Sequence, residues 1–263
     1  MRIPVIQGVI DRRILANFRV DPDRLRPLLP EPFCPKLVAG YGMAGICLIR
    51  LREVRPRGVP GVLGVSSENA AHRIAVTWEE GGSVREGVYV HRRDTDSRFN
   101  ALVGGRLFPG VHHHATFHCA EDAGRYEVVM DSDDGVTSVA VRGQLAGELP
   151  TGSVFGSVAD ASAFFEKGSV GYSPGRSDGT LDGLELRTAE WSVRPLAVES
   201  VRSSFFDGPT RFPAGSAVFD CALVMRDVRH EWHSRPAPAK SSGPACAKEV
   251  QADRTTDSFP PPR

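Results

Sequence analysis

The sequence is poor in lysine, in paired cysteine motifs and in long apolar runs. Of its 32 basic side chains only four are lysines, so the other 28 are arginines. Genomic base composition explains much of such a bias, but the bias also limits any chemistry that needs an amine nucleophile. The candidates for such chemistry are Lys36, Lys167, Lys240 and Lys248.

The chain also lacks a net charge, because 32 basic residues balance 32 acidic ones among its 263 residues. A non-specific nucleic-acid binder needs a concentrated excess of Lys and Arg, so we expect no nucleic-acid partner. The overall charge balance does not exclude a local cationic pocket. The five cysteines are scattered without Cys-x-x-Cys spacing, which argues against a disulfide framework or a structural zinc site and predicts reduced thiols.

No stretch approaches the run of about 18 apolar residues that a membrane-spanning helix needs, so we expect no membrane partner. The N-terminal segment has charged residues at 11–13 where a secretory signal would have a long apolar run. These features predict a cytoplasmic location. They are compatible with a homo-oligomer as well as with a monomer.

Short runs rich in Val, Ile, Leu and aromatic residues alternate with Gly-Gly, Asp-Gly and Pro-Gly turns. Asp21 before Pro22, and Ser157 before an apolar stripe, predict two short helices. Many strands with few helices predict a mostly antiparallel sheet, as a barrel or a sandwich. Strands are expected over residues 13–18, 44–52, 71–78, 84–90, 113–119, 126–131, 137–144, 184–193 and 217–226.

We expect a single β domain over residues 1–234 and a separate C-terminal tail over residues 235–263. The tail contains six prolines and almost no apolar periodicity. Such a segment cannot bury enough apolar surface to offset its ordering entropy, so the tail is predicted to be disordered.

The first candidate site is the polar segment 66–73, interpreted as a loop that runs into a strand. Its carboxylate, Glu68, can serve as a general base or can anchor an arginine. The alternative is a solvated turn without a function.

The second candidate site is the charged segment 89–100. Strand alternation divides it into two faces, one with His91, Arg93 and Thr95 and the other with Arg92, Asp94 and Asp96. Arginine beside aspartate most often forms a structural ion pair. The same density of charge directly after an apolar strand is typical of an anion-recognising pocket, because arginine binds carboxylates through two parallel hydrogen bonds.

The third candidate site is a strand on which His112, His114 and His118 share one face. Three imidazoles on one face could hold Zn²⁺ or Fe²⁺ with an open coordination position. No fourth ligand is evident, so a polar strand face or hydrogen-bonded imidazoles is the favoured interpretation, with a metal site as the alternative. The segment 229–233 has His-Glu without a second His at metal-binding spacing and is interpreted as structural.

Several motifs together resemble a known superfamily. Residues 18–33 resemble the strand, short helix and Pro-Glu-Pro element of acetoacetate decarboxylase, and residues 64–68 are similar to the loop that holds its active-site glutamate. Residues 85–93 align without a gap to its Arg-Glu…Pro-Lys-Lys segment. The closer resemblance is to the YqjF-like family of the same superfamily, through SSENAAHRIAV, HRRDTDSRFNALVGGRLFPGVHHH, ASAFFEKGSVGYSP and RHEW, which span most of residues 9–233.

The resemblance implies an acetoacetate decarboxylase-like antiparallel β-barrel with an internal cavity and a few short helices, and Glu68 as the pocket carboxylate. The Schiff-base lysine of the decarboxylase and its neighbour fall on Arg92 and Arg93. A guanidinium stays protonated and is a poor nucleophile, so we predict no amine-catalysed decarboxylation. The superfamily's pocket arginine falls on Asp11, and Arg12 or Arg13 would need a shift to replace it.

We therefore predict a barrel that binds a small, anionic organic acid or keto compound without a cofactor. Arg92 or Arg93 would hold the carboxylate, and Glu68 would act as base or orienter. The other predicted ligand-binding residues are His91, Asp94, Arg98 and Asn100. An enzyme with these groups would perform lyase-type or isomerase-type proton transfer next to a carbonyl. The alternatives are a non-catalytic carrier or sensor, and a metal-dependent enzyme that uses the histidine strand.

Overall fold

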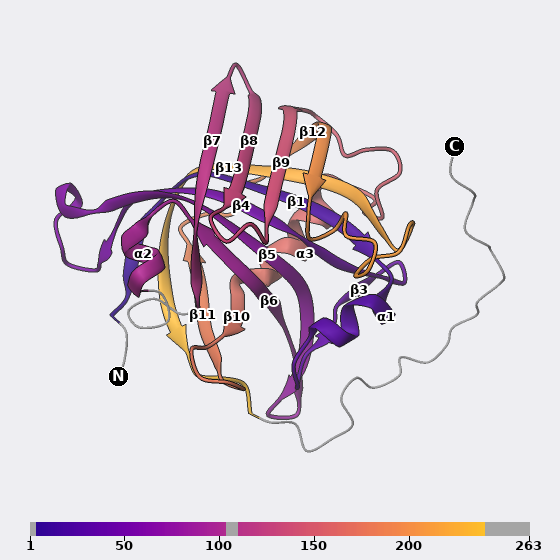
Figure 1. Cartoon of the computed structure of the whole chain (residues 1–263), viewed down its shortest axis with the longest axis horizontal. Helices are drawn as coiled ribbons and strands as arrows, with labels where there is room; N and C mark the ends of the chain where they lie inside the picture. Colours follow the sequence, from indigo (N-terminus) through magenta and orange to yellow (C-terminus); the bar gives the residue numbers. More distant parts are fainter. Residues whose placement is uncertain (1–3, 104–109, 240–263) are drawn as a thin grey trace.

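The computed structural model of the chain describes residues 4–103 and 110–239 (Figure 1). Within these residues the strands form one 13-stranded sheet. The strands are β1 (Ile6–Val20), β2 (Cys34–Pro35), β3 (Leu37–Val38), β4 (Tyr41–Pro56), β5 (Val65–Glu80), β6 (Ser83–Thr95), β7 (His112–Asp122), β8 (Arg125–Ser132), β9 (Ser138–Leu145), β10 (Val170–Pro174), β11 (Leu181–Thr188), β12 (Arg194–Ser203) and β13 (Ala217–Arg235). The helices are α1 (Pro22–Leu25), α2 (Arg98–Val103) and α3 (Val158–Glu166), with 3₁₀ turns η1 (Arg26–Leu28), η2 (Gly61–Leu63) and η3 (Lys167–Ser169).

The long strands β13, β1, β4, β5 and β6 form a continuous antiparallel layer, which we call the shared layer. Two sets of strands close it into rings. Strands β7, β8, β9 and β12 connect the end of β6 with the first half of β13. Strands β10 and β11 connect the middle of β6 with the second half of β13. The β6–β7 and β6–β10 pairings are parallel, which the antiparallel expectation did not include.

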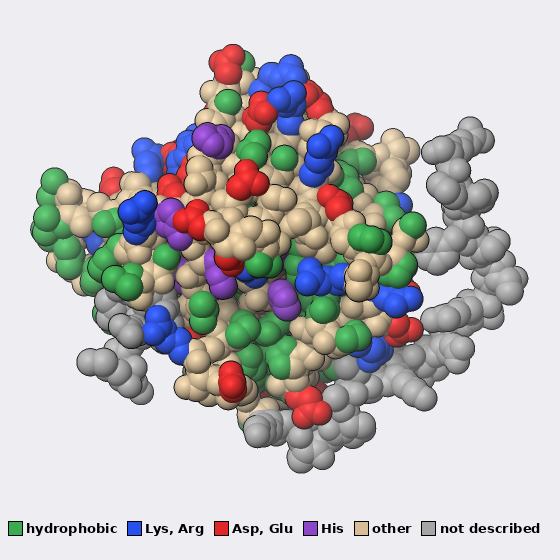
Figure 2. All heavy atoms as spheres, in the orientation of Figure 1, with side chains coloured by type: hydrophobic (Ala, Val, Ile, Leu, Met, Phe, Trp, Pro, Cys, Tyr) green, Lys and Arg blue, Asp and Glu red, His purple; other side chains and the backbone are tan. Residues whose placement is uncertain are grey.

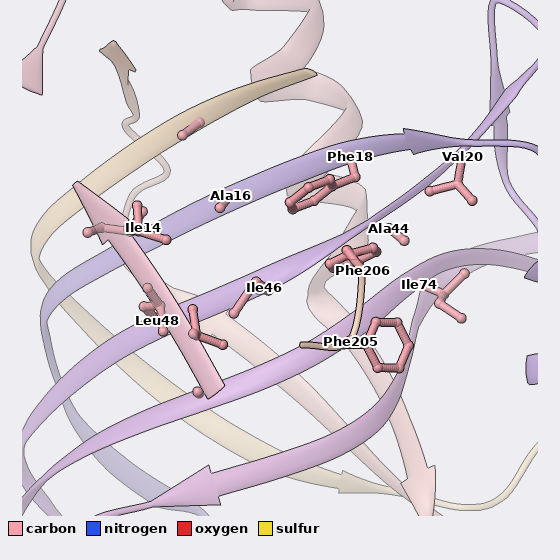
Figure 3. Close-up of a cluster of buried hydrophobic side chains, with 14 of the residues drawn as sticks. Ile14, Ala16, Phe18, Val20, Ala44, Ile46, Leu48, Ile74, Phe205 and Phe206 are labelled. Carbon is pink, nitrogen blue, oxygen red and sulfur yellow. The ribbon is translucent and has the colours of Figure 1, made fainter. Parts of the chain in front are cut away.

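One face of the shared layer, which we call the core face, packs against β7, β8, β9 and β12 around Ile14, Ile46 and Leu48 (Figure 3). The segment between β12 and β13 also fills this core. The ring of its Phe206 stacks on that of Phe18, with centroids 4.1 Å apart, and Phe205 lies next to Phe206. The largest hydrophobic core thus lies on the core face.

The opposite face of the shared layer, which we call the α3 face, is covered by α3. Phe165 of this helix packs against Leu15 and Ala75 in a second hydrophobic cluster. The predicted cap is correct, because the Ser157 side chain accepts a hydrogen bond from the backbone N–H of Asp160. The cap at Asp21, which precedes α1, is also correct.

The hairpin between β4 and β5 projects from the body of the molecule, at the left of Figure 1. At its tip the side chains of Val62 and Leu63 are 90% and 67% exposed, and hydrophobic atoms gather there in Figure 2. Elsewhere on the visible face, acidic and basic side chains are interspersed (Figure 2).

The structure confirms the predicted mostly β class and the two predicted capped helices, but it corrects four local predictions. Residues 66–73 belong to β5 and not to a loop, and the strand expected over 184–193 ends at Thr188. Strands β10 and β12 were not predicted. Cys47, Cys119 and Cys221 carry free thiols, as expected, whereas Cys34 is disulfide-bonded.

Strand β13 continues to Arg235, the first residue of the predicted tail. Residues 240–263 of that tail lie outside the described residues. In the described part of the chain, no helix is long and apolar enough to cross a membrane.

We predict that Phe206→Ala lowers the free energy of unfolding by about 3–5 kcal/mol, because it removes a buried ring and leaves a cavity. Phe99→Ala is the matched control, since the Phe99 side chain is 54% exposed, and it should cost less than about 1 kcal/mol. Urea unfolding curves of the two variants check this. Equal losses would show that Phe206 does not hold the core.

Candidate functional site

The register between β5 and β6 separates the predicted site residues. Ala71 pairs with Arg93, and His72 pairs with Arg92. Because successive side chains on a strand point to opposite faces, Arg92 and Arg93 lie on opposite sides of the shared layer. Arg93 lies on the α3 face. Glu68, Arg92 and Asp94 lie on the core face.

A cavity of about 90 Å³ borders Arg93. Its apolar wall comes from β1, β4, β11 and β13, through Ile6, Ile49, Leu51, Val54, Leu184 and Trp232. Its polar groups come from β5, β6, α2, β7 and β13: Ser67, Asn69, Arg93, Asp94, Asn100, His112 and Ser234. The carboxylate of Asp94 is bound by Arg92. An apolar cavity with a few convergent polar groups is the usual form of a small-molecule site.

Arg93 is the positive charge at this cavity. Its Nε and Nη2 donate to the Ser173 hydroxyl at 3.1 and 2.9 Å. Among the described residues, no carboxylate lies within ion-pair distance of its guanidinium. Burial is the main cause that lowers the pKa of Arg93, to about 10. The Arg93 guanidinium therefore has no direct ion-pair partner, and the charge of Asp182 acts on it only from beyond ion-pair distance.

Several other polar groups of the cavity present acceptor atoms. The Nδ2 of Asn69 is already used, because it donates to Ile49 O, Ser67 O and Ser67 Oγ. The Oδ1 of Asn100 is buried and has no hydrogen-bond partner. Nδ1 of His112 lies 3.0 Å from the carbonyl oxygen of Gly110. Since a carbonyl only accepts, Nδ1 carries the proton, and Nε2 is the acceptor of the neutral ring.

Glu68 belongs to an ion-pair network on the core face. It accepts from the fully buried Arg12 at 2.5 Å and also from Arg50. Glu121 of β7 is bound by Arg12 at 2.7 Å, by Arg50 at 2.9 Å and by Arg226 at 2.5 Å. The network ties β7 to β1, β4, β5 and β13, and it uses both oxygens of Glu68. The role of Glu68 as a base stays a prediction, and its carboxylate does not line the cavity.

Arg92 is also fully paired. Its guanidinium donates to the buried Asp94 at 2.8 Å and to Asp134, in the turn after β8, at 2.8 and 3.0 Å. This pairing holds β6 to the β8–β9 turn. Of the two arginines that the sequence proposed as carboxylate ligands, only Arg93 borders the cavity.

The expectation that His91 shares a face with Arg93 is wrong. The register shifts between His72 and Arg73, which inserts an extra residue into β6 and turns His91 to the core face. There its ring lies 5.4 Å from that of Phe205. Arg98 lies on α2 with an exposed side chain and does not line the cavity.

The three histidines of β7 have different surroundings. His112 lines the cavity, His114 is bonded to Asp133 at 2.7 Å, and His118 is exposed. Within residues 4–103 and 110–239, no group of three His, Cys, Asp or Glu side chains could hold a metal ion. The geometry thus does not favour the metal alternative.

Sequence reasoning missed Ser67, Asn69 and Ser173 as site residues. The first two flank Glu68, and strand alternation would have placed them on the face of Arg93 if residues 66–73 had been interpreted as a strand. No local signal marks Ser173, because its contact with Arg93 spans 80 positions.

Comparisons with known proteins agree with this geometry. The sequence model of the family DUF2071, described as an uncharacterized conserved protein, matches residues 10–215. An acetoacetate decarboxylase-like enzyme from Sphingomonas wittichii RW1 has a similar structure (TM-score 0.56, 11% identity, 90% of this chain and 93% of that chain). Acetoacetate decarboxylase from Legionella pneumophila gives a TM-score of 0.56 at 11% identity (88% and 86%). No curated protein matches.

A third similar structure is the enduracididine biosynthesis enzyme MppR complexed with pyruvate (TM-score 0.56, 12% identity, 89% of this chain and 90% of that chain). At these identities the likeness concerns the fold. It supports the acetoacetate decarboxylase-like architecture that the sequence motifs implied.

Buried neutral histidines predict that the protein loses stability in mild acid. Burial lowers the pKa of His72 to about 3 and the pKa values of His112 and His230 to about 4. The unfolded chain binds these protons near pH 6.5, so the free energy of unfolding falls as the pH drops from about 7 to about 4. Each histidine contributes up to about 1.4 kcal/mol per pH unit. The raised pKa values of Asp94 and Asp96 oppose this trend at its acid end.

Urea unfolding at pH 7.5 and 5.5 measures the effect. His72→Leu should reduce the difference between the two pH values, whereas His118→Gln, at an exposed position, should leave it unchanged. A wild-type stability that is equal at both pH values would contradict the prediction.

Substitution of the adjacent residues Arg92 and Arg93 should change the free energy of unfolding by very different amounts. Arg92→Met should cost about 3–5 kcal/mol, because it leaves the buried carboxylate of Asp94 without its partner. Arg93→Met should stay within about 1 kcal/mol of the wild type, since the loss of hydrogen bonds to Ser173 is offset by removal of an unpaired charge. Chemical denaturation at pH 7.5 checks this. A loss at position 93 as large as that at position 92 would mean that Arg93 is paired in the folded protein.

Proposed function

The chain belongs to the DUF2071 family, and on this premise we propose that its cavity binds a small organic acid whose carboxylate pairs with Arg93. The observation that carries the proposal is that, among the described residues, no carboxylate lies within ion-pair distance of this guanidinium, whose hydrogen-bond partner is the Ser173 hydroxyl. A buried cation is costly unless it is paired. An incoming carboxylate supplies the missing charge and can accept two parallel hydrogen bonds from the guanidinium.

The acceptors in the cavity define the rest of the ligand. The unpartnered Oδ1 of Asn100 and the Nε2 of His112 each need a donor. A carboxylate ligand that also carries a hydroxyl, or an enolised keto group, supplies one. We therefore propose a hydroxy or keto acid. The pyruvate complex of MppR supports this class, because a protein of similar fold binds a small keto acid.

The cavity volume limits the ligand to a few carbons. A single water needs roughly 10–15 Å³ of such space, so about 90 Å³ accommodates several groups of that size. The apolar wall from Ile49, Leu51 and Trp232 would contact the carbon skeleton.

The chemistry we propose does not use an amine. Lys36 does not line the cavity, and its Nζ lies 2.9 Å from a carboxylate oxygen of Glu86. Lys167 is exposed. Lys240 and Lys248 lie outside the described residues. In a reaction at this cavity, His112, which pairs with Arg93 between β6 and β7, is a neutral acceptor and would exchange a proton next to the ligand carbonyl, as in a lyase or an isomerase. A carrier or sensor would use the same contacts without turnover.

We expect Arg93→Met to raise the dissociation constant for small hydroxy or keto acids by about 10- to 100-fold, through loss of charge-assisted hydrogen bonds. Thermal-shift screening of a panel of such acids identifies the ligand, and calorimetric titration measures its affinity. Arg92→Lys is the matched control, because it keeps a positive charge beside Asp94 and leaves the cavity intact.

Unchanged affinity in Arg93→Met would overturn the proposed site. Loss of affinity in Arg92→Lys with retention in Arg93→Met would assign the carboxylate to the core face instead. Turnover measured on the same ligand separates an enzyme from a carrier.

A further inference from the structure

A second cationic cleft lies on the α3 face, between α3 and the shared layer. Three cations line it, Arg13, Lys36 and Arg73, together with the rings of Phe164 and Phe165. Its volume is about 10 Å³, which is room for one group the size of a water molecule. We call it the α3 cleft.

The strand register explains why two arginines meet there. Arg13 of β1 pairs with Ile49, and two residues later Leu15 pairs with Cys47. On the next strand, Cys47 pairs with Ala71. Since side chains two apart share a face, Arg13 and Arg73 both project from the α3 face, on strands that flank β4.

Neither arginine has a carboxylate partner among the described residues. Arg73, which is 5% exposed, donates to Asn17 Oδ1 at 2.5 Å and stacks on Phe165, while its Nε is buried without a partner. Arg13 donates through Nε to the Cys47 sulfur at 3.3 Å, and its Nη1 is buried without a partner.

The third cation is balanced. Lys36 is bound by Glu86 at 2.9 Å and lies 4.0 Å from the centre of the Phe164 ring. The cleft therefore holds two positive charges more than it holds negative ones. Burial lowers the pKa of Arg73 to about 10, and the charge of Arg13 adds to that effect. The two guanidinium groups thus repel each other in a space that excludes most solvent.

We propose that the α3 cleft binds one monatomic anion, chloride under cellular conditions, between the guanidinium groups of Arg13 and Arg73. Buried charges require a counter-charge, and the unpartnered Nε of Arg73 and Nη1 of Arg13 supply its donors. The cleft has room for about one water molecule and is too small for carboxylate, phosphate or sulfate, so a monatomic anion is the anion that suits its size best. This site is separate from the cavity at Arg93, and its argument does not rest on the proposed function.

Such an anion would fasten α3 to the sheet. It would lie among side chains of β1, β5 and α3. Phe165 of α3 stacks on Arg73. Trp191 lies against Arg13 and donates a hydrogen bond to Ser162 of α3. Halide binding should therefore raise the thermal stability of the full chain and change the fluorescence of Trp191.

The test compares sodium chloride and sodium bromide with sodium sulfate at constant ionic strength. We expect Tm to rise by about 3–6 °C when the halide is tenfold above its dissociation constant, and to go on rising with the logarithm of the halide concentration. Sulfate stabilises proteins by exclusion from their surface, so its effect should be the same in the wild type and in Arg73→Met. A crystal grown in bromide should show an anomalous peak between Arg13 and Arg73.

Variants identify the donors. Arg73→Met and Arg13→Met should each abolish the halide-dependent rise in Tm, whereas Arg142→Met, which removes an exposed arginine paired with Glu127, should retain it. If neither cleft variant folds, the bromide crystal of the wild type decides. Absence of the anomalous peak, or a halide-dependent rise in Tm that Arg73→Met and Arg13→Met both retain, would overturn the proposal.

Discussion

Every site in this protein depends on the alternation of side chains across the shared layer of β13, β1, β4, β5 and β6. The layer is covered on both faces, so each strand supplies two environments that differ by a single position in the sequence. Arg92 and Arg93 illustrate the effect, because Arg92 is bound by two aspartates whereas Arg93 borders a cavity and forms no ion pair among the described residues. The bulge at His91 then decides which residues fall on each face.

The two faces of the shared layer differ in whether their arginines form ion pairs. On the core face, Arg12, Arg50 and Arg226 are matched by Glu68 and Glu121 in a compact network. On the α3 face, Arg13, Arg73 and Arg93 have hydroxyl, amide and sulfur partners and no carboxylate among the described residues. A balanced overall composition therefore conceals a local excess of positive charge. The first arrangement joins the strands, and the second is the one in which we propose that anions bind.

The class, the helix caps and the superfamily resemblance could be predicted from sequence because they depend on local patterns, such as Ser157 before its apolar stripe. The assignment of Glu68 and Arg93 to different faces could not. It depends on whether residues 66–73 are extended and on a one-residue bulge, and neither has a clear local signal. Contacts such as Arg93 with Ser173, or Arg12 with Glu121, join residues 80 and 109 positions apart. They follow from strand order, which the sequence does not display.

Strand β13 lies in the interior of the sheet, yet it is the last of the described strands along the chain. It pairs with β1, β11 and β12, so both rings stay open until it is in place. During synthesis on the ribosome, β1 must wait for a partner that emerges about 200 residues later, with its apolar edge unpaired. The closed architecture that creates the cavity thus leaves one edge of β1 without its native partner until β13 has been synthesised.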